Sequence, residues 1–121
     1  TLGAKLGEQI AVAIANLNRC EYCLAAHTVL GQNAGASAAE MAEAQIGKAA
    51  DDKTAAALTF ALKVVNQRAQ MTDADITTLR NVDFNDQQIV EIMAHVALNI
   101  FTNYINITLD TPVDFPRVEL I

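Results

Sequence analysis

The sequence predicts an all-α fold, and three observations support that class. Apolar residues make up 52% of the 121 residues, and 22 of them are alanine, the strongest helix former. Aromatic residues make up only 5%, and stretches of alternating β-branched residues are hard to find. Apolar side chains recur at helical spacing instead. We therefore expect about six helices in one domain spanning residues 1–121, a length that can bury a modest core without disulfide staples.

The first two helices follow from their apolar pattern and from a break between them. Leu2 to Leu17 has apolar residues at helical spacing. From Ile10 onward it is apolar nearly all round, as expected for a helix buried in a core or an interface. Asn16 and Asn18 then weaken this helix, because asparagine has a low helix propensity. Cys20 falls near the start of the second helix, which we expect to end around Gly31 to Gly35.

Capping residues define the starts of the later helices. Ser37 and Thr72, each followed three residues later by an acid, have the pattern of a capping box. Asp51 and Asn85 are the expected N-caps of two longer helices. We expect these helices over Ser37 to Gly47, Asp52 to Gln70, Ala74 to Arg80, and Asp86 to about Asn106. For the helix predicted over Asp52 to Gln70, the expected apolar stripe consists of Ala55, Leu58, Leu62, Val65 and Ala69.

The tail and the abundance of apolar faces predict an oligomer. The closing DTPVDFPRVELI carries both prolines and no helical period, so we expect an extended segment able to dock on a neighbour. The apolar stretches Ile10 to Leu17, Ala55 to Leu58 and Ile92 to Ile100 together exceed what one domain of this size can bury. We therefore expect a homo-oligomer.

Charge and hydropathy limit the classes of partner. The formal net charge is -6, so the basic surface that nucleic acid requires is missing. No apolar run reaches the roughly 18 residues of a membrane span, and no signal peptide is visible, although a chain starting at Thr1 without Met leaves a missing N-terminal segment open. We expect a soluble, cytoplasmic protein that binds neither nucleic acid nor membrane. In that reducing compartment a close cysteine pair indicates catalysis or metal binding rather than a structural bridge.

The segment NRCEYCLAAH, residues 18–27, places Cys20, Cys23 and His27 on one face of a helix. One interpretation is zinc, with His95 as a fourth ligand, but zinc sites usually draw two ligands from each of two separate segments. Another is core packing, which accounts for most lone cysteines and histidines. The polar residues around the pair argue against packing, because they suggest a helix end that meets water or substrate. The third interpretation is thiol redox chemistry.

Redox chemistry needs a thiolate, and three features of this segment favour one. A helix N-terminus stabilises an anion, His27 lies one turn from Cys23 and could take its proton, and Cys20 is placed to close a disulfide with Cys23. We predict that Cys23 attacks and Cys20 resolves, because His27 is closer to Cys23. The helix terminus itself favours Cys20, which we expect to be the more exposed thiol and the one that meets the reductant.

Two further sets of polar residues leave alternatives open. Glu8 lies in an otherwise apolar face, and antiparallel return of the second helix would bring it beside His27 as part of a proton relay. From the pattern alone, a solvated surface charge is the more ordinary interpretation of Glu8. The stripe of His95, Asn99, Asn103 and Asn106 reads by default as a polar seam or an interface, and otherwise as a route for substrate.

The spacing of Glu8, Cys20, Cys23 and His27 in EQIAVAIANLNRCEYCLAAH resembles the core motif of the alkylhydroperoxidase AhpD-like proteins, within the carboxymuconolactone decarboxylase family. The later DADITTLRNVDFNDQQIVEIMAHVALNIFTNYIN and the closing VDFP resemble short, peroxidase-related members. The likeness therefore covers nearly the whole chain.

This resemblance implies an AhpD-like helical fold, assembly as trimers or hexamers, and thiol-dependent reduction of hydroperoxides without metal or bound cofactor. It implies that Cys20 and Cys23 are the redox pair, that Glu8 and His27 relay protons, and that an external dithiol, such as the lipoyl group of a partner protein, is the electron donor. Some members have a histidine where this chain has Tyr22, so the relay must be shorter or run through Tyr22 or water. The alternatives are a thiol–disulfide oxidoreductase with little peroxide activity, or a zinc-bound or structural helical module. Lactone decarboxylases of the family generally lack the CxxC, so that activity is not expected.

Overall fold

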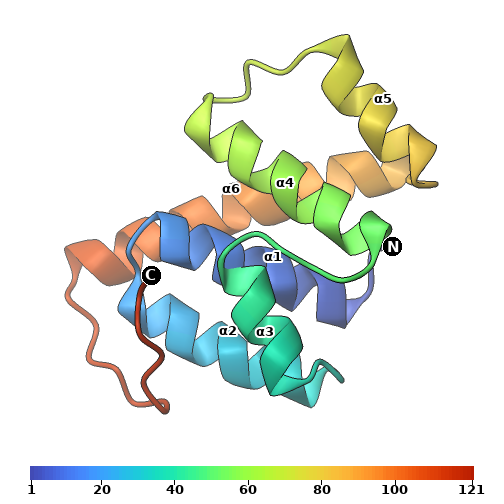
Figure 1. Cartoon of the computed structure of the whole chain (residues 1–121). Coiled ribbons are helices and arrows are strands. Elements are labelled where there is room, and N and C mark those ends of the chain that lie inside the picture. Colours follow the sequence, from blue (N-terminus) through green and yellow to red (C-terminus); the bar gives the residue numbers. More distant parts are fainter.

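Six α-helices and no strands make up the computed structural model, which describes residues 1–121 (Figure 1). The helices are α1 (Ala4–Leu17), α2 (Glu21–Asn33), α3 (Ala38–Gln45), α4 (Asp52–Asn66), α5 (Asp73–Asn81) and α6 (Asp86–Thr108). The predicted fold class and number of helices are confirmed. No helix combines the length and the apolar character that crossing a bilayer would need.

Helix α1 is the centre of the fold. It packs against α2, α3, α4 and α6, with α2 and α3 on one side, α4 on the other, and α6 crossing behind (Figure 1). Every residue from Gln9 to Asn16 is buried. A helix that is apolar nearly all round can only be stable when neighbours cover all of its faces, which explains this central place.

The predicted caps begin the later helices. Ser37 opens α3 and Thr72 opens α5, each with both hydrogen bonds of a capping box. Asp51 caps α4, and Asn85 caps α6 with a capping box of its own. Each cap satisfies backbone N–H groups that the first turn of a helix leaves without partners.

The end and the buried face of α4 differ from the prediction. The helix ends at Asn66 rather than Gln70, because Arg68 and Ala69 adopt left-handed backbone angles, with φ of 52° and 66°. Its buried residues are Ala57, Leu58, Phe60, Ala61 and Val64. Of the predicted stripe, only Leu58 is buried, so the face that meets the core is rotated from the one that the pattern indicated.

The tail is extended, as predicted, but it docks on its own chain. Asn16 accepts a hydrogen bond from the backbone N–H of Ile121 at 2.9 Å, and Gln45 donates one to the carbonyl of Glu119 at 2.7 Å. The C-terminus thereby returns to the end of α1 (Figure 1). These contacts give hydrogen-bond partners to two polar side chains that are buried.

Candidate functional site

The two cysteines lie at the start of α2, where the chain turns out of α1. Arg19 has a left-handed backbone, with φ of 63°, and Cys20 follows it as the N-cap residue of α2. The sulfur of Cys20 accepts the backbone N–H of Cys23 at 3.3 Å. A sulfur in this position faces the positive end of the helix, which stabilises a thiolate.

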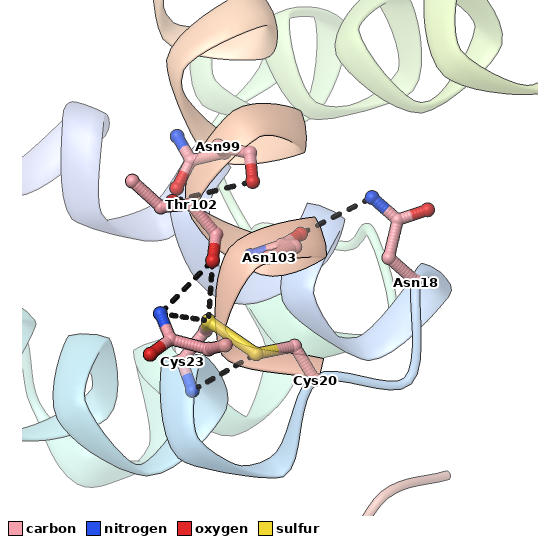
Figure 2. The surroundings of a disulfide bond; sticks show 7 residues. Asn18, Cys20, Cys23, Asn99, Thr102 and Asn103 are labelled. Atoms are coloured by element: carbon pink, nitrogen blue, oxygen red, sulfur yellow. Dashed lines mark hydrogen bonds between the residues drawn. A yellow bond between two sulfur atoms is a disulfide. The ribbon is translucent and has the colours of Figure 1, made fainter. Parts of the chain in front are cut away.

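Cys20 and Cys23 are joined by a disulfide (Figure 2), and their Cα atoms are 5.4 Å apart. This separation lies in the normal range for a disulfide. Both residues are buried, with 1% and 2% of their surface exposed. The expectation that Cys20 is the more exposed thiol is therefore wrong: the turn before α2 folds both side chains against α6 and the end of α1.

The sulfur of Cys23 faces α6. It lies 4.0 Å from the carbonyl oxygen of Thr102 (Figure 2). It also lies 3.6 Å from the amide nitrogen of Asn106. The Asn106 amide nitrogen also donates to the Thr102 carbonyl, at 2.9 Å. One residue of α6 thus brings an N–H group to the sulfur.

Glu8 and His27 form a close pair between α1 and α2. Oε2 of Glu8 is 2.6 Å from Nδ1 of His27, and both side chains are about a quarter exposed, at 24% and 25%. The carboxylate accepts a hydrogen bond from Nδ1, which leaves Nε2 of a neutral ring as the nitrogen able to accept a proton. The antiparallel return of α2 on α1 produces this contact, which the sequence pattern leaves open beside a solvated surface charge for Glu8.

A cavity of about 310 Å³ brings the pair and Cys23 together. Glu8, His27 and Cys23 line it along with Tyr22, and α6 closes it with His95 and other residues. A second cavity, of about 390 Å³, lies on the Cys20 side of the disulfide. Tyr22 and Asn106 line both cavities, so they form the wall between them.

His95 reaches the first cavity because α1 carries a glycine where the ring lies. A Cβ atom on Gly7 would come within 2.8 Å of Cε1 of His95. A glycine in the interior of a helix costs about 1 kcal/mol relative to alanine, so the space that it leaves for His95 has a cost in stability. His95 therefore lies against α1 one residue from Glu8.

The polar stripe on α6 contributes partly to hydrogen bonds between side chains and backbone and partly to the lining of the cavity. Asn99 bonds the carbonyl of His95 at 2.7 Å, and Asn103 accepts from Asn18 at 3.1 Å. The Nδ2 of Asn103 is buried without a partner. His95, Asn99 and Asn106 also line the cavity that holds Cys23, and only Asn103 does not, so the polar seam describes only part of this stripe.

Of the four residues singled out in the sequence, Glu8, Cys23 and His27 line one cavity, and Cys20, bonded to Cys23, lines the other. Their catalytic roles stay predictions. Sequence reasoning missed the contact between Asn106 and Cys23, whose only signal was the polar spacing along the last helix. No group of three His, Cys, Asp or Glu side chains is arranged to hold a metal ion.

Comparisons with known proteins point to one family. Residues 1–67 match the sequence profile of the carboxymuconolactone decarboxylase family. No curated protein matches the chain.

Two crystal structures of longer proteins share the fold. One is an uncharacterized peroxidase-related protein from Silicibacter sp. TM1040, with 24% identity and a TM-score of 0.83, over 98% of this chain and 61% of the other. The second is an alkylhydroperoxidase AhpD core, an uncharacterized peroxidase-related protein from Ralstonia eutropha JMP134, with 25% identity and a TM-score of 0.80, over 95% of this chain and 60% of the other. The chain therefore spans about three-fifths of the length of each.

Proposed function

The chain belongs to the carboxymuconolactone decarboxylase family as an AhpD-like member, and on that premise we propose that it is a thiol-dependent hydroperoxide reductase. One observation carries the proposal: Cys23, half of a CxxC disulfide, lines the same cavity as the Glu8–His27 pair. A nucleophile, a base and a group that orients the base are the constituents of an activated thiol.

The reaction begins from the reduced pair. His27, oriented by Glu8, takes the proton of Cys23, and the thiolate attacks one oxygen of a hydroperoxide. The O–O bond breaks, the sulfur becomes a sulfenic acid, and the departing alkoxide takes the proton back and leaves as an alcohol. The thiol of Cys20 then attacks the sulfenic sulfur, which forms the disulfide and releases water. One peroxide is reduced by two electrons, and two thiols are oxidised.

An external dithiol must reduce the disulfide, since the reaction consumes both thiols. We propose that the donor is a small dithiol or the lipoyl group of a partner protein, and that it attacks from the cavity beside Cys20. That cavity has room for a dithiol chain, at about 390 Å³, and leaves the Glu8–His27 side free for peroxide. No metal or bound cofactor takes part in this scheme.

The runner-up is a thiol–disulfide oxidoreductase with little activity towards peroxide, because the same thiols serve disulfide exchange. Peroxide consumption with a panel of dithiol donors, dihydrolipoamide among them, separates the two. We expect repeated turnover of peroxide that needs a donor and is lost in both Cys20→Ser and Cys23→Ser. Exchange activity without peroxide consumption would favour the runner-up, and stoichiometric zinc in the wild type that is lost in Cys20→Ser would contradict both.

The roles of the two cysteines are tested by trapping the intermediate. After one dose of peroxide, Cys20→Ser should accumulate a sulfenic acid on Cys23, because no second thiol is present to condense with it. Cys23→Ser should accumulate none, since Cys20 lines the opposite cavity from His27. A dimedone adduct detected by mass spectrometry measures this, and the reverse labelling pattern would exchange the two roles.

A further inference from the structure

Asn106 is the residue of α6 that brings a side-chain N–H group into contact with the redox pair. Its Nδ2 lies 3.6 Å from the sulfur of Cys23. The other hydrogen bond to a sulfur in this structure comes from the backbone N–H of Cys23 and goes to Cys20. The two sulfurs therefore accept hydrogen bonds from different donors. Cys20 accepts one from a backbone N–H at the start of α2, and Cys23 accepts one from a side chain of α6.

The orientation of the Asn106 amide is fixed by a second contact. Its nitrogen lies 2.9 Å from the carbonyl oxygen of Thr102, one turn earlier on α6. A carbonyl oxygen only accepts hydrogen bonds, so the end of the amide that faces it must be the NH2 group. The same NH2 group faces Cys23, and its second hydrogen is free for the sulfur.

The strength of this contact depends on the state of the sulfur. In a disulfide or a thiol, sulfur is a weak acceptor. In a thiolate it carries a full charge, and hydrogen bonds to a charged group are the stronger ones. A donor that favours the charged form lowers the pKa of that group. The hydrogen bond from the Asn106 amide is therefore strongest when the disulfide is reduced and Cys23 loses its proton.

We propose that Asn106 is a catalytic residue that stabilises the Cys23 thiolate through its side-chain N–H group. It does for Cys23 what the N-cap position does for Cys20. This inference rests on the proposed function in taking Cys23 as the attacking thiol. The donor lies on α6, 83 residues after Cys23 in the chain. The Glu8–His27 pair lies on α1 and α2.

The test measures the ionisation of Cys23 alone. In a Cys20→Ser background the chain has one thiol, and serine is a good N-cap, so α2 keeps its start. The rate of iodoacetamide alkylation against pH then reports the pKa of Cys23 without peroxide or electron donor. Adding Asn106→Ala removes the donor, and adding Asn106→Asp replaces it with a negative charge.

We expect Asn106→Ala to lower the alkylation rate near pH 7 by about threefold to tenfold, the effect of raising the thiol pKa by up to one pH unit. Asn106→Asp should lower it further, and both rates should recover above about pH 9. The matched control is Thr77→Ala on α5, which removes a side-chain hydrogen bond to the carbonyl four residues earlier but no contact with sulfur and no residue of the cavity. It should leave the curve unchanged.

A curve for Asn106→Ala that superimposes on its parent would overturn the inference, and so would equal shifts in Asn106→Ala and Thr77→Ala. A shift in Asn106→Ala with no peroxide consumption by the wild type would sink the proposed function while leaving the role of Asn106 intact. Thermal unfolding of each variant shows whether a shifted curve comes from a folded protein.

Discussion

The contact between Glu8 and His27 arises from the way two helices meet. Neither side chain stands out in its own helix: Glu8 is a lone acid in α1, and His27 is a half-buried residue of α2. At 2.6 Å the two form a charge-assisted contact beside the cavity that holds Cys23. The carboxylate accepts the hydrogen bond from Nδ1 and so holds the ring in one tautomer.

Replacing Glu8 tests that relay. Glu8→Gln should slow the alkylation of the reactive thiol near neutral pH, by up to about tenfold, because the imidazolium that forms on deprotonation of the thiol loses its partner. The rate should recover at higher pH, where hydroxide removes the proton. His27→Ala should act on the same step, so the double variant should be little slower than the worse single one.

The matched control is Glu40→Gln, which removes a carboxylate that pairs with Lys5 of α1 away from the sulfur. It should leave the alkylation curve in place. Curves for wild type and Glu8→Gln that superimpose would return Glu8 to the status of a surface charge.

Residues close in sequence could be predicted to meet, and residues far apart could not. Cys20, Cys23 and His27 share a helix, so their spacing alone places them on one face. Glu8 lies on the preceding helix, α1, and only a short connection separates α1 from α2. An antiparallel return is the ordinary way for two such adjacent helices to pack. Asn106 lies 83 residues from Cys23, and nothing in the pattern of α6 says which of its faces will meet α2.

Helix starts in this chain were predictable, and helix ends were less so. A start has a specific signal, a side chain that bonds the free N–H groups, and four such residues begin α3 to α6 as predicted. The end of α4 has none: left-handed residues stop it, although arginine and alanine favour helices. The buried face of α4 was missed because alanines occur on several of its faces and blur the apolar stripe.

The cap of α4 supplies a prediction at the scale of the element. Asp51 accepts the backbone N–H of Thr54 at 2.9 Å. Hydrogen bonds from the side chain and then the backbone of Thr54 hold the pKa of Asp51 below its usual value. Asp51→Ala should therefore cost about 1 kcal/mol of unfolding free energy at pH 7.

That cost should depend on pH in one direction. Because the pKa is lower in the folded protein, the contribution is complete above the unfolded value near 3.9 and is lost as the pH falls through the lowered one. Urea unfolding at pH 7 and at about pH 3 measures it, with the neighbouring Asp52→Ala as the control, which should have a smaller effect. An Asp51→Ala cost that is as large at pH 3 as at pH 7 would contradict the role of its charge.

At the scale of the whole molecule, the apolar faces divide into one that is covered and one that is not. The stretch from Ile10 to Asn16 is entirely buried within the single chain, so it needs no partner, contrary to the argument from its sequence. Helix α6 is different: Leu98, Phe101 and Tyr104 are 57%, 63% and 58% exposed. No Asp, Glu, Lys or Arg lies between Glu91 and Asp110. This outer face of α6 is the apolar surface that assembly would cover.

We predict that the protein is a homo-oligomer, a trimer or a hexamer, held together in part through the outer face of α6. Phe101→Glu should shift it towards the monomer, because assembly would bury a charge without a partner. Ile46→Glu changes an exposed apolar residue at the C-cap of α3 and should leave the assembly intact. Sedimentation at micromolar concentration measures the mass, and a wild-type mass of one chain, 13.0 kDa, would end this prediction.

The central claim is that the Cys20–Cys23 pair reduces peroxide by its own two electrons, and one single-turnover measurement tests it most directly. Fully reduced protein, freed of the reductant and without any donor, is mixed with limiting hydroperoxide, and both free thiols and remaining peroxide are counted. We predict that two thiols disappear for each peroxide and that mass spectrometry finds the Cys20–Cys23 disulfide as the product. Peroxide that persists while both thiols stay reduced would contradict the claim.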